Sequence, residues 1–148
     1  MKEHRYLTYI QESIALIEAR TAGGSDAFLS DQFIQDAVLW RLQTLGEATR
    51  HLSAAPKERH REIPWQRVTG FRNVAAHGYL NLSLTDSWDI IQPHLPTLKT
   101  VVEEELGSEA SDYRSWLMIS IGLASAAAGP ATSGPSSPPE SAASWRRA

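Results

Sequence analysis

Apolar residues recur through the first hundred positions at steps of three and four, the spacing of one face of an α-helix. The first stripe consists of Tyr6, Ile10, Ile14 and Ile17. The second stripe consists of Ile34, Val38, Leu42, Leu45 and Leu52. We expect the first helix to end at Gly23-Gly24. The second should begin near Ser30, a good N-cap residue, and end before Pro56.

Two further helices are predicted in the rest of the patterned region. A third helix can start at Pro64, because the first helical position needs no amide partner, and Gly78 is the natural residue to end it. This places His77 at a helix C-terminus. The fourth stripe consists of Trp88, Ile91, Leu95, Leu98 and Val102. Pro93 and Pro96 interrupt that stripe and are expected to kink or split the helix.

These elements predict an all-α fold, an antiparallel four-helix bundle with short loops. The stripes lie within residues 1–107, which we assign to one helical domain. Residues 108–148 are rich in Ser, Ala and Pro, so we expect a largely disordered, flexible C-terminal tail. Within that tail, residues 112–128 are either a short helix packed on the domain or a sticky segment, and the sequence does not decide between them.

Composition removes several classes of protein. The chain has no cysteine, which excludes disulfide bonds, thiolate metal sites and a cysteine nucleophile. Four of its five histidines show no metal-ligand spacing, so we expect no metal and no cofactor. The charged first dozen residues do not resemble a secretory signal. The apolar run from Trp116 to Ala128 is shorter than the roughly 17–25 residues of a spanning helix. A cytoplasmic protein without membrane contact is expected.

Charge is unevenly distributed along the chain. The segment between Arg50 and Arg72 carries six basic residues, which are Arg50, Lys57, Arg59, Arg61, Arg67 and Arg72. Only Glu58 and Glu62 oppose them. A local positive field favours a polyanionic partner, because phosphate binding is driven mainly by charge and counterion release. The plain alternative is a solvated loop with several arginines.

The segment Arg72-Asn73-Val74-Ala75-Ala76-His77-Gly78-Tyr79 concentrates four hydrogen-bonding side chains in eight positions. The planar fork of Arg72 can hold a phosphate through two parallel hydrogen bonds. The imidazole of His77 can accept or donate a proton near neutral pH. This combination favours phosphate chemistry. The plain alternative is a surface cap for the last carbonyls of a helix.

The same segment, RNVAAHGY, resembles the R-x4-H-x-Y motif of the HepT toxin family, a branch of the HEPN-domain ribonucleases. Its surroundings are similar to that family as well. Leu45-Gly46-Glu47-Ala48 resembles a helical IGEA stretch, and Ile63-Pro64-Trp65 resembles the family's entry into the motif helix. Downstream, Trp88 and Leu95-Pro96-Thr97-Leu98 also match. The resemblance covers roughly residues 4–106 and implies a HEPN-like bundle.

The resemblance also implies an activity and a partner. It implies a homodimeric, metal-independent endoribonuclease that acts as the toxin of a type VII-like HepT/MNT toxin–antitoxin pair and cuts cellular RNA, with tRNA as the expected target. Arg72 and His77 would be catalytic and Asn73 would bind the substrate. An MNT-type nucleotidyltransferase antitoxin would silence the enzyme by attaching AMP to Tyr79. The alternative is a non-catalytic nucleotide-binding or scaffold subunit of a nucleotidyltransferase complex.

Two residues before the motif have weaker claims to a role. Gly46 stands inside the second helix, where glycine costs about 1 kcal/mol relative to alanine. We interpret it as a place where a neighbouring helix approaches closely, in preference to a direct role in a site. Glu47 is a further candidate, as a residue that lines the groove in which the motif would act.

Overall fold

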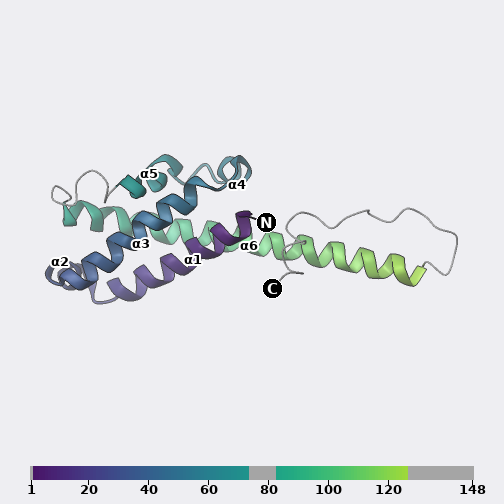
Figure 1. Cartoon of the computed structure of the whole chain (residues 1–148), viewed down its shortest axis with the longest axis horizontal. Coiled ribbons are helices and arrows are strands. Elements are labelled where there is room, and N and C mark those ends of the chain that lie inside the picture. The colour runs from purple at the N-terminus through teal and green to yellow at the C-terminus, as the bar shows by residue number, and fades with distance from the viewer. Residues whose placement is uncertain (1, 74–82, 127–148) are drawn as a thin grey trace.

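A computed structural model of the chain describes residues 2–73 and 83–126 (Figure 1). Its helices are α1 (Lys2–Thr21), α2 (Gly24–Ser30), α3 (Gln32–Arg50), α4 (Ala54–Arg59), α5 (Trp65–Gly70), the 3₁₀ turn η1 (Phe71–Asn73) and α6 (Leu84–Ala126). No strand occurs in these two ranges. The predicted all-α class is therefore confirmed.

Three long helices form the body of the bundle, and short helices complete it. Helix α1 packs against both α3 and α6. Helix α3 also contacts α2, α5 and η1. Helices α4 and α5 lie on the side of α3 away from α1 (Figure 1). The fourth side of the bundle is thus built from α4, α5 and η1 in place of one long helix.

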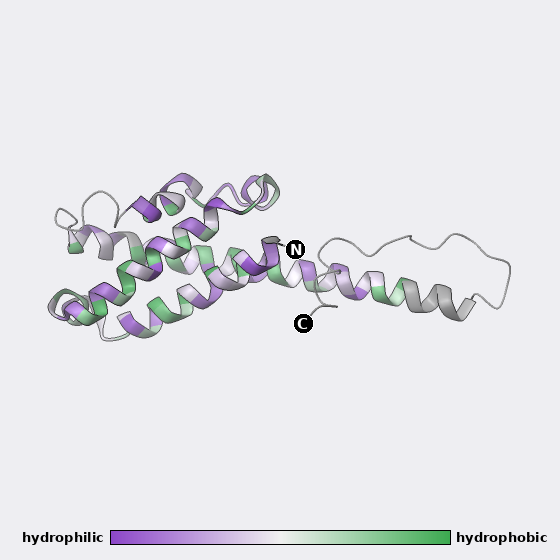
Figure 2. Ribbon diagram, in the orientation of Figure 1, coloured by the Kyte–Doolittle hydropathy of each residue, from purple (hydrophilic) through white to green (hydrophobic). Residues whose placement is uncertain are grey.

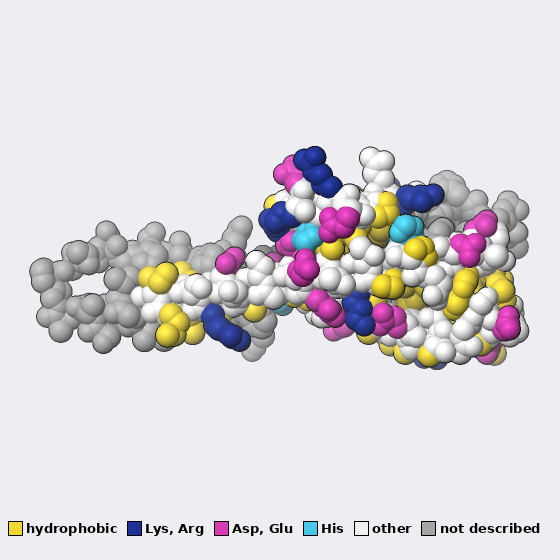
Figure 3. All heavy atoms as spheres, turned by 180° about the vertical axis from the view of Figure 1, so that it is seen from behind, with side chains coloured by type: hydrophobic (Ala, Val, Ile, Leu, Met, Phe, Trp, Pro, Cys, Tyr) yellow, Lys and Arg dark blue, Asp and Glu magenta, His cyan; other side chains and the backbone are white. Residues whose placement is uncertain are grey.

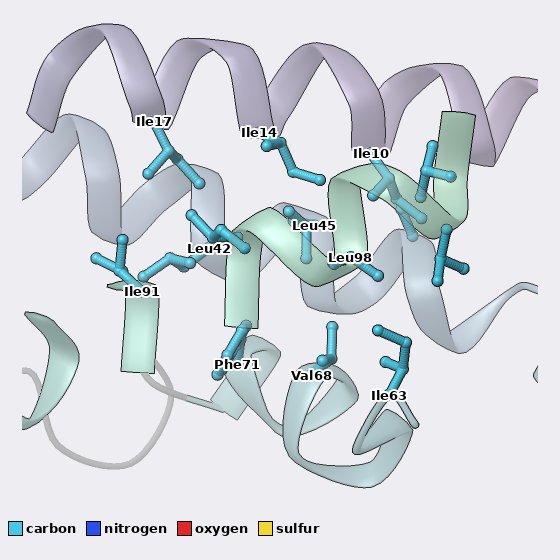
Figure 4. Packing of buried hydrophobic residues seen from close by; sticks show 14 of the residues in the cluster. Ile10, Ile14, Ile17, Leu42, Leu45, Ile63, Val68, Phe71, Ile91 and Leu98 are labelled. Atoms are coloured by element: carbon cyan, nitrogen blue, oxygen red, sulfur yellow. The ribbon is translucent and has the colours of Figure 1, made fainter. Parts of the chain in front are cut away.

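The predicted stripes meet in one core (Figure 4). Its fully buried members include Leu7, Ile10, Ile14, Ile17, Phe28, Val38, Leu42, Leu45, Val68, Leu98 and Val102. Hydrophobic and hydrophilic stretches alternate along the ribbons of α1 and α3, as expected for amphipathic helices (Figure 2). Ile63, Val68 and Phe71 anchor the α4–α5–η1 side to this core. Burial of one apolar face per helix therefore fixes how the short helices sit on α3.

The connection between the first two long helices differs from the prediction. The short helix α2 begins at Gly24, which has a φ of 86°, a left-handed conformation that favours glycine. The N-cap of α3 is Asp31, whose carboxylate accepts hydrogen bonds from the amides of Phe33 and Ile34. The expectation that Ser30 caps this helix is wrong by one residue, because Ser30 ends α2.

The predicted third helix begins at Trp65, one residue after the expected start, because Pro64 is its N-cap and not its first helical residue. The carbonyl of Pro64 accepts two amide hydrogen bonds, of 2.8 and 3.1 Å, that open α5. The prediction of one continuous helix to Gly78 is wrong at residues 71–73, where the 3₁₀ turn η1 replaces the α-helix. Gly70 is a weak helix former and precedes the change directly. The predicted helix end at His77 lies outside the described residues.

The sequence predicts that two prolines kink or split the last helix, and the split is wrong. Helix α6 runs as one element through Pro93 and Pro96. Both prolines are exposed. Because proline has no N–H, the carbonyls of Asp89 and Gln92, four residues earlier, each lack a helical hydrogen bond, and these two residues are exposed as well. Water can satisfy these carbonyls on the outer face, while the apolar stripe on the opposite face stays buried.

Helix α6 also continues beyond position 107 without interruption, so residues 108–126 are helical and project from the bundle (Figure 1). Near the point where α6 leaves the bundle, His4 Nδ1 of α1 lies 2.7 Å from the Glu109 carboxylate. Residues 127–148 lie outside the described residues. No helix of the described ranges has a stretch apolar enough to cross a membrane.

A cluster of charged groups, which we call the Glu105 clamp, ties the α4–α5 connection to α6. The buried Glu105 carboxylate accepts hydrogen bonds from the Arg59 guanidinium and from His60 Nε2, the latter at 2.8 Å. His60 Nδ1 lies 3.1 Å from Glu62. Side chains of both charges and a histidine lie together where α6 projects from the bundle (Figure 3). The clamp thus fixes the chain just before Trp65, whose indole N–H donates to the His60 carbonyl at 2.7 Å.

The Glu105 clamp should make stability depend on pH. Burial acts to lower the pKa of His60, but hydrogen bonds to Glu105 and Glu62 outweigh it and raise that pKa above its ordinary value. The contribution of His60 is then fully present below the ordinary histidine pKa of about 6.5 and is lost as pH rises through the raised value. We expect His60→Gln to remove this loss, measured as the free energy of urea unfolding between about pH 6 and about pH 9.

His94→Gln is the matched control for this experiment, because His94 lies on α6 away from the clamp. In this control, the free energy of unfolding should fall at alkaline pH as it does in the unmodified chain. An equally steep fall in His60→Gln would show that the clamp is not its source.

Candidate functional site

The motif arginine is positioned by a close contact between two backbones. A Cβ atom added at Gly46 would lie 2.7 Å from the amide nitrogen of Arg72 and 2.9 Å from the carbonyl oxygen of Val68. Only glycine allows α5 and η1 to approach α3 this closely. The structure therefore confirms the packing interpretation of Gly46. The same contact places the backbone of Arg72 directly on α3.

An ion cluster on α3 faces Arg72. The Glu47 carboxylate lies 2.7 Å from Arg50 Nη2, 3.0 Å from His51 Nε2 and 3.7 Å from Arg72 Nη1. The hydrogen bond from Arg50 is the main reason that the pKa of Glu47 falls to about 2. Glu47 is therefore ionised at every pH near neutrality. Tyr6 stacks on the His51 ring with centroids 4.9 Å apart, which joins this cluster to α1.

Two hollows in the surface lie on either side of the Glu47–Arg72 pair. The larger is a groove of about 620 Å³ between α1 and α3, and Glu47 and His51 line it. The smaller, which we call the α4–α5 pocket, has a volume of about 330 Å³. The residues that line it are Lys57, Trp65, Gln66, Thr69, Gly70, Arg72 and Asn73.

The basic segment predicted from the sequence is not one continuous patch. Arg50 pairs with Glu47, and Arg59 pairs with Glu105, so carboxylates offset both charges. Lys57 and Arg72 line the same pocket, and the Glu47 carboxylate lies 3.7 Å from Arg72. Folding thus divides the six basic residues, and it brings two of them together beside the motif.

The structure brings two of the four predicted site residues together. Arg72 and Asn73 are consecutive in η1, both are exposed, and both line the α4–α5 pocket. His77 and Tyr79 lie outside the described residues. Within the described ranges, no group of three His, Asp or Glu side chains is arranged to hold a metal ion.

Sequence reasoning missed two contributors to this region. Lys57 appeared only as one charge in a basic segment, and nothing in the order of residues showed that it shares a pocket with Arg72. His51 could have been found, because positions 47, 50 and 51 are spaced three and four apart and share one helix face.

This arrangement can bind a phosphodiester. An exposed guanidinium beside a side-chain amide offers several hydrogen-bond donors to phosphate oxygens. The Glu47 carboxylate lies 3.7 Å from Arg72 Nη1, where the two hollows meet. The region can therefore hold an anion beside Arg72 and Asn73.

Comparisons with known proteins agree with this chemistry. The family model described as "Ribonuclease HepT-like" matches residues 10–105. The chain is 33% identical over 100 residues to the "Probable ribonuclease HepT" of Thermococcus cleftensis, covering 67% of this chain and 91% of that protein. It is 29% identical over 105 residues to a "Putative RNase" of Caldanaerobacter subterraneus subsp. tengcongensis, covering 70% of this chain and 94% of that protein.

A longer relative shares only part of its length with this chain. The "Gamma-glutamylcyclotransferase and putative RNase" of Methanocaldococcus jannaschii is 35% identical over 95 residues, which is 64% of this chain but 43% of that protein. No solved structure matches the chain significantly. The family match over residues 10–105, together with these relatives, shows that the chain belongs to the HepT-like ribonuclease family.

Proposed function

We propose that this protein is a metal-independent endoribonuclease that acts as the toxin of a toxin–antitoxin pair, with cellular RNA, and tRNA in particular, as its substrate. The observation that carries the proposal is the exposed Arg72–Asn73 pair, seated on α3 at Gly46 in a chain of the HepT-like ribonuclease family. The domain that acts is residues 1–107, which contain the whole family match.

The reaction requires a base, an acid and a cation. A ribose 2′-OH attacks the neighbouring phosphate as its proton is removed, and the 5′-oxygen of the next nucleotide leaves as it gains a proton. The products are a 2′,3′-cyclic phosphate and a 5′-hydroxyl. We assign the proton transfers to His77 and the stabilisation of charge on the non-bridging oxygens to Arg72. Asn73 would hydrogen-bond the same phosphate.

A two-fold dimer would complete this site. In-line displacement needs proton transfer on both sides of phosphorus, whereas each chain supplies one His77. A C2 dimer that pairs the motifs would bring two imidazoles and two guanidinium groups to one cleft.

The absence of native cysteine allows a direct test of this dimer. We expect Ala76→Cys, beside His77, to form a disulfide-linked dimer in high yield under mild oxidation, because paired motifs place the two thiols close together. A single cysteine at Ala19→Cys, exposed on α1, serves as the control and should give little linked product on electrophoresis. Equal yields from both variants would contradict paired motifs.

Regulation would act on the same site. Attachment of AMP to Tyr79 by a nucleotidyltransferase antitoxin adds negative charge close to Arg72 in the sequence. That charge would compete with the RNA backbone for the cationic groups and repel the substrate. The modified toxin would therefore be inactive.

Growth measurements distinguish this proposal from a non-catalytic scaffold subunit. Expression of the chain alone should stop growth, and co-expression of its proposed nucleotidyltransferase antitoxin should restore it. His77→Ala should be harmless at the same protein level. If the unmodified chain never impairs growth, or if His77→Ala impairs it equally, the scaffold alternative is favoured.

A further inference from the structure

The α4–α5 pocket has the composition of an anion site. Lys57 and Arg72 contribute two positive charges, and none of the described residues that line the pocket is acidic; the Glu47 carboxylate lies outside the lining, 3.7 Å from Arg72. The chain as a whole has a formal charge of −3, so this local excess of positive charge runs against the overall balance. The volume of about 330 Å³ lies within the range of small-ligand sites, roughly 300–1,000 Å³.

Lys57 is held in place without a carboxylate. Its ammonium donates a hydrogen bond of 3.1 Å to the carbonyl of Leu52, and within the described residues it forms no salt bridge. Burial lowers the pKa of Lys57, although the more distant charge of Glu3 acts in the opposite direction. A partly desolvated cation with no carboxylate in contact gains most from an anion that enters the pocket.

Trp65 gives the pocket an aromatic wall with a fixed orientation. Its indole N–H donates to the His60 carbonyl at 2.7 Å, and the Glu105 clamp holds His60 itself. The indole is partly exposed and lines the pocket. An aromatic side chain beside paired cations is the combination that binds single-stranded nucleic acid, in which bases stack on the ring and phosphates contact the cations.

We propose that the α4–α5 pocket is a subsite for one unpaired RNA nucleotide next to the scissile bond, with its phosphate between Lys57 and Arg72 and its base against Trp65. The inference rests on the proposed ribonuclease function and adds the substrate class. A base can reach Trp65 only when it is not paired and stacked within a duplex, so the enzyme would select single-stranded segments and loops.

Gly70 provides a way to block the pocket without touching the groups that bind RNA. It lines the pocket, a Cβ atom added there meets nothing within 4 Å, and its φ is not positive. Gly70→Glu would place a negative charge in the pocket. Gly70→Gln has the same size without the charge, and Gly70→Ala adds only a methyl group. All three variants should fold, which the far-ultraviolet circular dichroism and the unfolding midpoint would verify.

The probe is a fluorescein-labelled single-stranded RNA of twelve nucleotides, measured by anisotropy, alongside the same RNA annealed to its complement. We expect Gly70→Glu to weaken binding of the single strand by at least about 10-fold, Gly70→Gln to have a smaller effect, and Gly70→Ala to match the unmodified protein. Trp65→Leu should weaken the single strand more than the duplex. Unchanged affinity in Gly70→Glu, or equal affinity for both RNA forms, would overturn the inference.

Cleavage of the same RNA separates this inference from the proposed function. If the unmodified protein cleaves RNA and Gly70→Glu binds and cleaves it equally well, the subsite is wrong and the ribonuclease function stands. If the protein binds the single strand through the pocket but never cleaves it, the subsite stands and the function fails. If it binds no RNA, both are wrong.

Discussion

Arg72→Ala is expected to lower the rate of RNA cleavage by about 10²- to 10³-fold, the usual cost of removing one group that stabilises charge in a transition state. The Arg72 side chain is 42% exposed, and its contact with Glu47 at 3.7 Å is loose, so its removal should barely change the unfolding midpoint. Arg72→Lys should recover part of the rate, because it keeps the charge but loses the planar fork. The measurement is single-turnover cleavage of end-labelled RNA.

Arg67→Ala is the matched control for this prediction. Arg67 is also exposed and lies five residues earlier, in α5, but it does not line the α4–α5 pocket. Its loss should reduce cleavage only a few-fold, through the general attraction of RNA. If both alanine variants lost activity equally, Arg72 would be one charge in a diffuse field and not a group at the reaction centre.

Gly46→Ala is expected to lower the free energy of unfolding by about 1–3 kcal/mol, although alanine is the better helix former by about 1 kcal/mol. The added Cβ would lie 2.7 Å and 2.9 Å from backbone atoms of Arg72 and Val68, which no side-chain rotation can relieve. Helix α5 and η1 must move away from α3, and Arg72 moves with them. Cleavage should therefore fall in the folded variant, as measured alongside urea unfolding.

Gly107→Ala is the control for the clash of the added Cβ atom. Gly107 also lies inside a long helix, but a Cβ atom added there meets nothing within 4 Å. We expect Gly107→Ala to be neutral or stabilising by up to about 1 kcal/mol and to leave cleavage unchanged. A Gly46→Ala variant as stable and active as Gly107→Ala would contradict the role of Gly46 in placing Arg72.

Much of the fold could be predicted from periodicity, because burial of one apolar face is a property of each helix on its own. Ile10, Ile14 and Ile17 of α1 are fully buried, as the spacing indicated. The split expected at Pro93 and Pro96 does not occur, because each proline removes one hydrogen bond at an exposed position while the opposite face of α6 stays buried in the core. The short helix α2 carries too few residues to show a period.

The site was predictable only in part. Arg72 and Asn73 were found because the motif is contiguous in sequence. The partnership of Lys57 with Arg72 depends on how α4 and α5 sit on α3, which no local pattern encodes. Gly46 was predictable in part. The sequence indicated a close approach of another helix, but only the structure shows that the backbone of Arg72 makes it.

The most direct test of the central claim is the chemistry of the RNA ends. Purified protein would be incubated with labelled tRNA in excess EDTA, beside His77→Ala, and the fragments analysed by mass spectrometry. We predict cleavage by the unmodified protein alone, with 2′,3′-cyclic phosphate on one fragment and a 5′-hydroxyl on the other. Intact RNA in EDTA, fragments with 3′-hydroxyl and 5′-phosphate ends, or equal cleavage by His77→Ala would contradict it.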